Sequence, residues 1–294
     1  MKVEAGTEEH KEIFCRQFLD THKPFTPEEL DWPNLSEETI EKLKGFPIWD
    51  YAIFTETRVG LKLSAYAKVV DDPLIREAIA LQGYEEGRHA DILRCFLKQY
   101  EIPFKELAQE PLEDDLEKSF MSTGAGECID SFFAFGFIQI SKASKDYPSS
   151  LIEVMEPIVE EEARHIMFIH NWLLYMRHCH KFPMPQIHWF NTLLAFASAG
   201  WSRLMDLKKM GGESFTIQAA DIEKSSMSPK AFINLCYQEN KKRLEEFDPR
   251  LYRPKLIPRL MNQVQFFLER DSGLKANRHS LIIFSSLLYC RQFR

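Results

Sequence analysis

The chain contains one pentapeptide almost unchanged in two places. Glu85-Glu86-Gly87-Arg88-His89 and Glu161-Glu162-Ala163-Arg164-His165 differ at a single position. The inner pattern Glu-x-x-His is weak alone, because a chain with nine histidines and this many glutamates gives roughly one match by chance. Given two matches, agreement of both the preceding Glu and the Arg before His is expected in only about one case in 200. The repeat therefore indicates two halves of one site.

Helix geometry allows each repeat to hold a metal ion. Residues three apart on a helix lie about 60° from each other around the axis, so their side chains share a face. Glu86 with His89, and likewise Glu162 with His165, can each offer one carboxylate and one imidazole. Two divalent ions need more negative charge than this, so we expect bridging carboxylates from neighbouring helices.

Helix-boundary residues and apolar spacing predict the segments that carry these motifs. Pro47 suits a first helical turn, and Asp72 followed by Pro73 can cap and start the next helix. In the fourth segment, Pro157 predicts a kink or a later start. No stretch alternates convincingly as a strand does, so we expect an all-α fold. The four segments are residues 45–70, 72–100, 123–143 and 150–178.

Two further glutamates hold the places that additional ligands require. Glu56 lies within an apolar stretch of the first segment, where an unpaired carboxylate would be costly. It precedes Glu86 by 30 residues. Glu127 lies at the start of the phenylalanine-rich third segment and precedes Glu162 by 35 residues. Each half is therefore predicted to be a helical hairpin with one carboxylate on its first helix and Glu-x-x-His on its second.

The regions between and around the hairpins suggest a domain plan. Pro103 and Pro111 lie in an acidic stretch and predict a long crossover between the second and third helices. We expect the four-helix bundle to span residues 46–180, after an N-terminal lead-in of residues 1–45 with two short helical stretches. Residues 181–294 are a predicted helical extension packed on the bundle. Its expected helices are 186–210, 228–247 and 256–269, before an apolar run at 281–290.

Over roughly residues 46–178, the sequence resembles the ferritin-like di-iron carboxylate superfamily, whose motif is one Glu followed by Glu-x-x-His, twice over. The fuller form, with an acid before the ligand Glu and an Arg before the His, is more similar to the oxygen-activating branch than to ferritins. Soluble acyl desaturases and bacterial multicomponent monooxygenases belong to that branch. The metal ligands that the resemblance implies are Glu56, Glu86, His89, Glu127, Glu162 and His165.

The residues flanking the ligands have a physical role in this picture. A metal-bound imidazole uses one ring nitrogen for the ion and needs an acceptor for its other N–H group. By similarity, Glu85 would accept from His165, and Glu161 would accept from His89. The adjacent arginines would balance the buried acids. The complete flanking set is Glu85, Arg88, Glu161 and Arg164.

The ligand set also suggests the metal and the function. Four carboxylates match two divalent ions, and hard carboxylates with one imidazole per ion suit Fe(II) or Mn(II) better than copper or structural zinc. We expect two iron ions, with manganese or a mixed iron–manganese pair as alternatives. The resemblance implies a non-haem di-iron oxidoreductase that uses O₂ and an external electron-donor protein to oxidise an unidentified organic substrate. Hydroxylation, N-oxygenation, desaturation and oxidative cleavage all fit.

Two other functions remain open. One is a metal-handling protein, such as a ferroxidase, an iron store or a manganese catalase. The other is a bundle whose metal only stabilises the fold. The long stretch after the bundle argues against a ferritin cage, whose subunits are short, and a homodimer is compatible with the sequence.

Composition narrows the partners and the compartment. Lys and Arg number 37 against 44 Asp and Glu, for a net charge of −7, and no basic stripe offers a surface for nucleic acid. The six cysteines lie far apart without a CxxC pair, and no signal-peptide pattern is present, so we expect a cytoplasmic protein. The longest apolar run, 281–290, is about half the length of a membrane-spanning helix, so we expect no membrane span.

Overall fold

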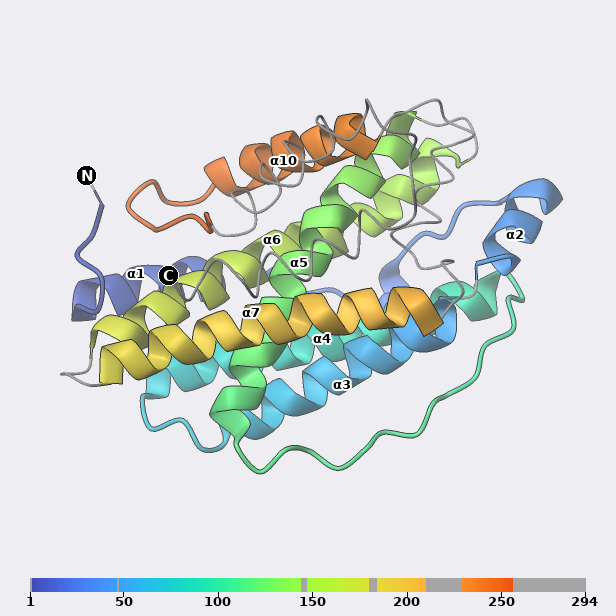
Figure 1. The fold of residues 1–294 in the computed structure, drawn as a ribbon. Coiled ribbons are helices and arrows are strands. Elements are labelled where there is room, and N and C mark those ends of the chain that lie inside the picture. The colour runs from blue at the N-terminus through green and yellow to red at the C-terminus, as the bar shows by residue number, and fades with distance from the viewer. Residues whose placement is uncertain (1, 47, 144–146, 180–183, 210–228, 256–294) are drawn as a thin grey trace, which may run out of the picture.

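The computed structural model describes residues 2–46, 48–143, 147–179, 184–209 and 229–255 (Figure 1). Within these ranges the chain forms α-helices and one short 3-10 helix and no strand, so the predicted all-α fold is confirmed. The elements are α1 (Glu8–Asp20), η1 (Pro27–Glu29), α2 (Glu37–Lys44), α3 (Trp49–Ala67), α4 (Pro73–Gln99), α5 (Leu116–Ala143), α6 (Ser149–His178), α7 (Met184–Lys209) and α10 (Pro229–Glu245). The helix expected at 256–269 and the apolar run 281–290 lie outside the described residues.

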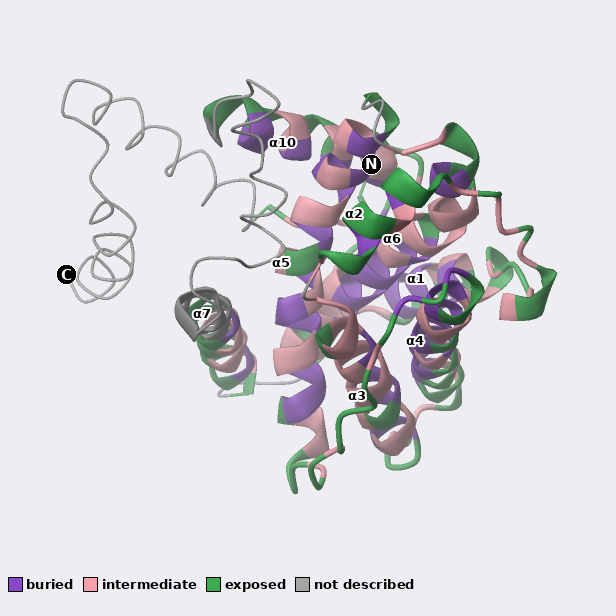
Figure 2. Ribbon diagram, turned by 90° about the vertical axis from the view of Figure 1, so that its right-hand side faces the viewer, coloured by how far each residue is buried: buried purple, intermediate pink, exposed green. Residues whose placement is uncertain are grey.

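Helices α3, α4, α5 and α6 correspond to the four segments expected from the sequence. The longest shared interface is that of α3 with α4, and α5 packs against both α6 and α3. In Figure 2 the buried side of α4 faces these neighbours and its exposed side faces outwards. None of the helices in the described ranges combines the length and the apolar character of a membrane-spanning segment.

The predicted crossover between α4 and α5 is a long non-helical connection along the outside of the bundle (Figure 1). Hydrogen bonds join it to α3 at several points. Gln109 donates to the carbonyl of Phe54 at 3.1 Å, and Arg58 donates to the carbonyl of Pro111 at 2.9 Å. The bond from Arg58 satisfies a backbone carbonyl that the connection would otherwise leave to water.

The start of one helix agrees with the prediction from the sequence, and the starts of two others differ from it. Asp72 caps α4 by accepting from the N–H groups two and three residues on, as predicted. Helix α5 begins at Leu116, earlier than the predicted start at residue 123. The side chain of Asp115 accepts a hydrogen bond from the backbone N–H of Lys118 and so stabilises the first turn. The later start that Pro157 suggested for α6 is wrong, since the helix runs from Ser149 through this proline.

The N-terminal segment shares the core of the bundle. Helix α1 packs against α6 and α4. Phe14 and Phe18 are almost fully buried, and their rings lie 5.6 Å and 5.0 Å from that of Phe168 on α6. The region expected as a polar lead-in therefore contributes large apolar side chains to the same core, although the domain boundaries themselves stay a prediction.

Two described helices of the C-terminal region also pack on the bundle. Both α7 and α10 contact α5 and α6. The side chain of Asn240 on α10 donates to the carbonyl of Phe132 on α5 at 3.1 Å. These contacts leave α5 among the most enclosed helices of the described structure.

Candidate metal centre

Glycines allow α3 and α4 to approach closely at the level of the first pentapeptide. A methyl group added at Gly60 would lie 3.0 Å from both the carbonyl oxygen of Gly83 and the nitrogen of Gly87, so the two backbones are in direct contact there. Glu56 lies one turn before Gly60, and Glu86 lies between the two glycines of α4. The close approach therefore brings these two carboxylates together.

Four of the expected ligands form one compact group. Glu56, Glu86, His89 and Glu162 each offer a ligand atom, and these atoms lie within 4.8 Å of one another. Around Nδ1 of His89, the nearest carboxylate oxygens are those of Glu162 at 3.2 Å, Glu56 at 3.6 Å and Glu86 at 3.7 Å. Helices α3, α4 and α6 thus converge on one imidazole nitrogen.

The second imidazole faces the same carboxylates from the other side. Nδ1 of His165 lies 3.0 Å from Glu86 and 3.8 Å from Glu162, and its ring centroid is 5.7 Å from that of His89. Glu86 and Glu162 are therefore near both imidazoles. We expected neighbouring helices to provide the bridging carboxylates, but the Glu-x-x-His glutamates themselves occupy the position between the two rings.

Glu127 lies beside this group rather than within it. Among the described residues, it is not one of those whose ligand atoms meet within 4.8 Å. Burial and the charges of Glu86 and Glu162 raise the pKa of its carboxyl well above the usual range. Helix α5 comes near because Gly124, one turn earlier, packs directly against Ile169 of α6.

The hydrogen bonds expected for the outer nitrogens of both histidines are present. Nε2 of His89 lies 2.9 Å from Glu161, and Nε2 of His165 lies 2.9 Å from Glu85. Each bond links α4 to α6. The two repeats therefore support each other's imidazoles across the interface, and each histidine keeps its Nδ1 directed at the carboxylates.

The two arginines of the repeat neutralise these outer acids. Arg88 donates to Glu161, and Arg164 donates to Glu85 at 2.8 Å. All four side chains are buried or nearly so. Each buried acid is thus paired with a charge and a hydrogen-bond donor, as a buried carboxylate requires.

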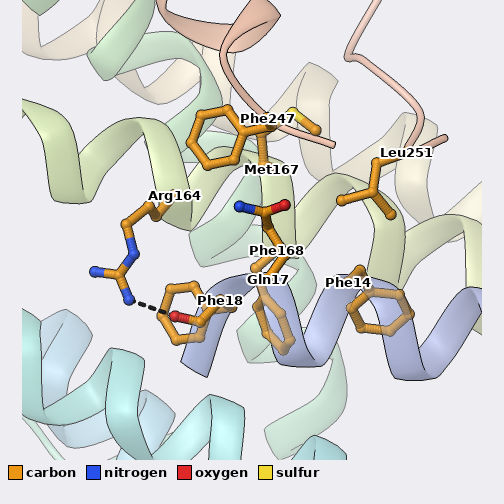
Figure 3. Close-up of a pocket in the computed structure, with 8 residues that line it drawn as sticks. All are labelled: Phe14, Gln17, Phe18, Arg164, Met167, Phe168, Phe247 and Leu251. Carbon is orange, nitrogen blue, oxygen red and sulfur yellow. Dashed lines mark hydrogen bonds between the residues drawn. The ribbon is translucent and has the colours of Figure 1, made fainter. Parts of the chain in front are cut away.

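The N-terminal segment holds both arginines in place. The carbonyl of Phe18 accepts from Arg164 at 2.6 Å, a contact visible in Figure 3, and the carbonyl of Phe25 accepts from Arg88 at 3.1 Å. The same phenylalanine rings lie under the guanidinium groups, at 4.6 Å for Phe18 and 3.9 Å for Phe25. The mostly apolar pocket of Figure 3 lies beside this contact and includes none of the cluster's carboxylates.

Three supporting residues were missed in the sequence. His22, whose Nδ1 lies 2.5 Å from Glu85, sits in the stretch taken for a lead-in. Gln82 donates to Glu86 at 3.4 Å, and Ser131 donates to Glu162 at 3.2 Å. Gln82 lies one turn before Glu86 on the same helix face, and this spacing is a signal that could have identified it. Nothing in the local sequence connects His22 to a repeat more than 60 residues away.

Three atoms of the cluster provide a test of whether it suits a metal. Nδ1 of His89, Nδ1 of His165 and Oε2 of Glu86 are buried and have no hydrogen-bond partner, whereas nearly all buried polar atoms have one. His10 shows the contrast, because it is equally buried but pairs both ring nitrogens, with Asn171 and with the Gly6 amide. Cations between the imidazoles and carboxylates would satisfy all three atoms, so the residues fit a metal pair.

The pKa shifts of the cluster residues also favour a site that binds cations. Burial raises the pKa of Glu56, the nearby imidazole of His89 opposes the shift, and the resulting value is about 8. Burial disfavours charged imidazoles, but the surrounding carboxylates outweigh it and raise the pKa of His89 and of His165 well above the usual value. The cluster therefore attracts protons strongly, as expected for a site built to hold positive charge.

A second group, His22, Glu85 and Glu161, also has ligand atoms within 4.8 Å of one another. Its two carboxylates are already bonded to arginines and to the outer nitrogens of the histidines. Little negative charge remains there for a cation. This group supports the inner cluster rather than forming another metal site.

No protein-family model, curated protein or solved structure matches the chain. The described residues form a helical protein with a buried cluster of acidic and histidine side chains that could hold metal.

Proposed function

We propose that this chain is a ferritin-like di-iron carboxylate protein of the oxygen-activating branch, an oxidoreductase that uses O₂ to oxidise an organic substrate. The main support is the arrangement of His89 and His165. Each imidazole bonds an outer carboxylate through Nε2 and directs an unpartnered Nδ1 at shared carboxylates. Histidines that only fill a core do not need this arrangement.

The ligand roles follow from the distances. Glu86 and Glu162 would bridge two ions, because each lies near both imidazoles. Glu56 would complete the position at His89. Glu127 would complete the position at His165, by its place on the first helix of the other hairpin. When bound, an iron pair supplies the one-electron steps that oxidation by O₂ requires.

The chain's own residues orient these ligands. Glu85 and Glu161 fix which ring nitrogen of each histidine carries the proton, and so which one faces the cluster. Gln82 and Ser131 each donate to one of the two proposed bridging carboxylates and limit its rotation.

The carboxylates of the centre differ in how far they are exposed to solvent. The side chain of Glu56 is 29% exposed, that of Glu162 is 12% exposed and that of Glu86 is fully buried. We therefore place the approach of the organic substrate on the α3 side, where Glu56 lies. On the opposite side, residues 18–25 cover the outer acids and exclude water from the histidines.

An anaerobic Fe(II) titration followed by exposure to O₂ tests the proposal. The purified chain should bind two Fe(II) ions, consume O₂ and oxidise the iron. Glu86→Ala and His89→Ala should lose metal, while Glu160→Ala, which changes an exposed acid beside the second repeat, should retain it. Failure of the protein to oxidise added Fe(II), together with unchanged metal content in both ligand variants, would contradict the proposal.

The metal-handling function and the structural-metal function predict different results for the same purified protein. An iron store would elute from size-exclusion chromatography as a large closed assembly and accumulate far more than two irons per chain. A manganese catalase would release O₂ from peroxide. A structural metal would change the melting temperature without any redox reaction.

A further inference from the structure

We propose that the two metal positions are unequal: the position at His89 binds its ion tightly, and the position at His165 binds more weakly, with His22 as a positioning residue that keeps it weaker. This inference rests on the proposed metal centre. The near identity of the two pentapeptides would suggest equal positions. The difference arises from residues outside the repeat.

The first observation concerns the inner ligands. Nδ1 of His89 has carboxylate oxygens from Glu56, Glu86 and Glu162 at 3.2 to 3.7 Å. These four side chains already form a compact ligand set. The corresponding set for His165 is less complete, because in the described structure Glu127 lies outside such a group. An ion at His165 must therefore draw Glu127 inwards, which costs binding free energy.

The second observation concerns the outer acids. Glu161 accepts from two side chains, Arg88 and His89. Glu85 accepts from three, namely Arg164, His165 and also His22, which approaches Glu85 Oε1 at 2.5 Å. In the described part of the chain, the extra donor on Glu85 has no counterpart on Glu161.

This extra donor weakens the support for one imidazole. A carboxylate that accepts the outer N–H of a ligand histidine draws on that proton and makes the inner nitrogen a better donor to metal. Each additional hydrogen bond to the carboxylate stabilises its charge and reduces this effect. Glu85 should therefore strengthen His165 less than Glu161 strengthens His89. Both observations favour tighter binding at His89.

His22 is not needed to hold the N-terminal segment. Phe18 and Phe25 bind the two arginines through their carbonyls. Lys23 forms a surface ion pair with Glu160 at 2.7 Å. Removing the imidazole of His22 should leave these contacts in place, so its effect on metal binding can be measured in a folded protein.

The test is a titration of metal-free full-length protein with Co(II), which does not react with O₂ as Fe(II) does and reports its ligands by visible absorption. Calorimetry gives the stoichiometry and both dissociation constants. We expect two ions bound with affinities about tenfold apart or more. His22→Leu should tighten the weaker step by about threefold to tenfold and leave the tighter step unchanged. The effect is smaller than the roughly 10- to 100-fold change that follows loss of an outer partner itself, because Glu85 is kept.

Matched variants distinguish an effect of His22 on metal affinity from an effect on the fold. His22→Asn retains an N–H donor at the place of Nδ1, near Glu85, and should behave as the wild type. Lys23→Met alters the neighbouring residue of the same segment and should change neither step. His165→Ala should keep one tightly bound Co(II), whereas His89→Ala should lose the tight step. This last pair tests the inequality even if His22→Leu does not fold.

The outcomes distinguish the inference from the proposed function. Two equal binding steps in the wild type, or a tight ion kept by His89→Ala and lost by His165→Ala, would overturn the inequality while leaving the metal centre standing. An unchanged or weaker second step in His22→Leu would overturn the role of His22. No Co(II) binding by the wild type would overturn the proposed centre itself.

Discussion

The two hairpins carry the same pentapeptide but are built differently around it. In the α3–α4 hairpin, Gly60 brings the backbones into direct contact beside the cluster. In the α5–α6 hairpin, Gly124 instead receives the side chain of Ile169. The first hairpin is fastened by the crossover, whereas the second is packed against α7 and α10. A short motif can therefore specify ligands without specifying how the helices that carry them are packed.

The single residue by which the two pentapeptides differ, Gly87 or Ala163, illustrates the difference in packing between the hairpins. Ala163 is buried and its methyl group belongs to the main core. A methyl group added at Gly87 would meet nothing within 4 Å. The glycine of the first repeat is thus not required by crowding at its own Cβ position.

The largest effect should come from removing a carboxylate shared by both halves. If Glu86 and Glu162 each serve both ions, Glu86→Ala and Glu162→Ala should abolish metal-dependent stabilisation to a similar extent. For the wild type, two-state unfolding should show a gain of about 4 kcal/mol for each bound ion at a free-ion concentration about a thousandfold above that ion's Kd. Thermal or denaturant unfolding with and without Mn(II) measures it, and Glu160→Ala is the control. Loss of only one ion's contribution in either variant would show that the halves bind independently.

A second prediction tests the backbone contact of the first hairpin. Gly60→Ala would press a methyl group against backbone atoms of Gly83 and Gly87, which cannot move as a side chain can. Overpacking costs about 1–3 kcal/mol, of which better helix propensity offsets at most about 1 kcal/mol. Urea unfolding of the metal-free protein measures the loss.

Gly200→Ala is the matched control, because Gly200 is exposed on α7 with open space at its Cβ position. That variant should be as stable as the wild type or slightly more stable. Equal stability of Gly60→Ala and Gly200→Ala would show that the α3–α4 contact can relax.

The sequence was most informative where short-range physics decides. Asp72-Pro73 predicted the start of α4 because a cap needs only neighbouring residues. The pairing of Glu85 and Glu161 with their histidines, by contrast, came from the resemblance to a known family, and its physical reason is that a metal-bound imidazole needs an acceptor for its other N–H group. The start of α5 was missed because Asp115 caps a stretch whose apolar pattern is weak.

The missed contributors are those whose partners lie far along the chain. Phe18, His22 and Phe25 reach residues on α4 and α6 that are at least 60 positions away. Their local sequence contains Lys, Thr and Pro and resembles a solvated segment. Without the fold, no periodicity in the sequence connects these residues to the site. Their contribution to the site could therefore not be predicted.

A third prediction concerns pH and the more exposed carboxylate. Burial raises the folded-state pKa of Glu56 to about 8, against roughly 4.3 for an unfolded Glu. The folded protein therefore holds a proton that the unfolded chain releases between these values, and stability of the metal-free protein should fall as pH rises through that window. The contribution is at most about 1.4 kcal/mol per pH unit.

Unfolding of metal-free protein between pH 5 and pH 8 measures this slope. Glu56→Gln cannot ionise, so its stability should depend less steeply on pH. Glu160→Gln, at an exposed position, should keep the slope of the wild type. A slope that is equally steep in Glu56→Gln would show that Glu56 does not hold the proton, and the comparison with Glu127→Gln would then assign it to the other hairpin.

The smallest effect is expected from making the two repeats identical. Gly87→Ala adds a methyl group into open space and replaces a poor helix former within α4, so it should stabilise the protein by up to about 1 kcal/mol. Metal stoichiometry should not change, because Glu86 and His89 keep their places on the helix. The reciprocal Ala163→Gly should cost at least about 1 kcal/mol, since it also removes a buried methyl group from the core. If Gly87→Ala instead lowered stability or metal content, the contact of Gly87 with Gly60 would be too close to tolerate any change, and the difference between the repeats would itself be a packing requirement of the first hairpin.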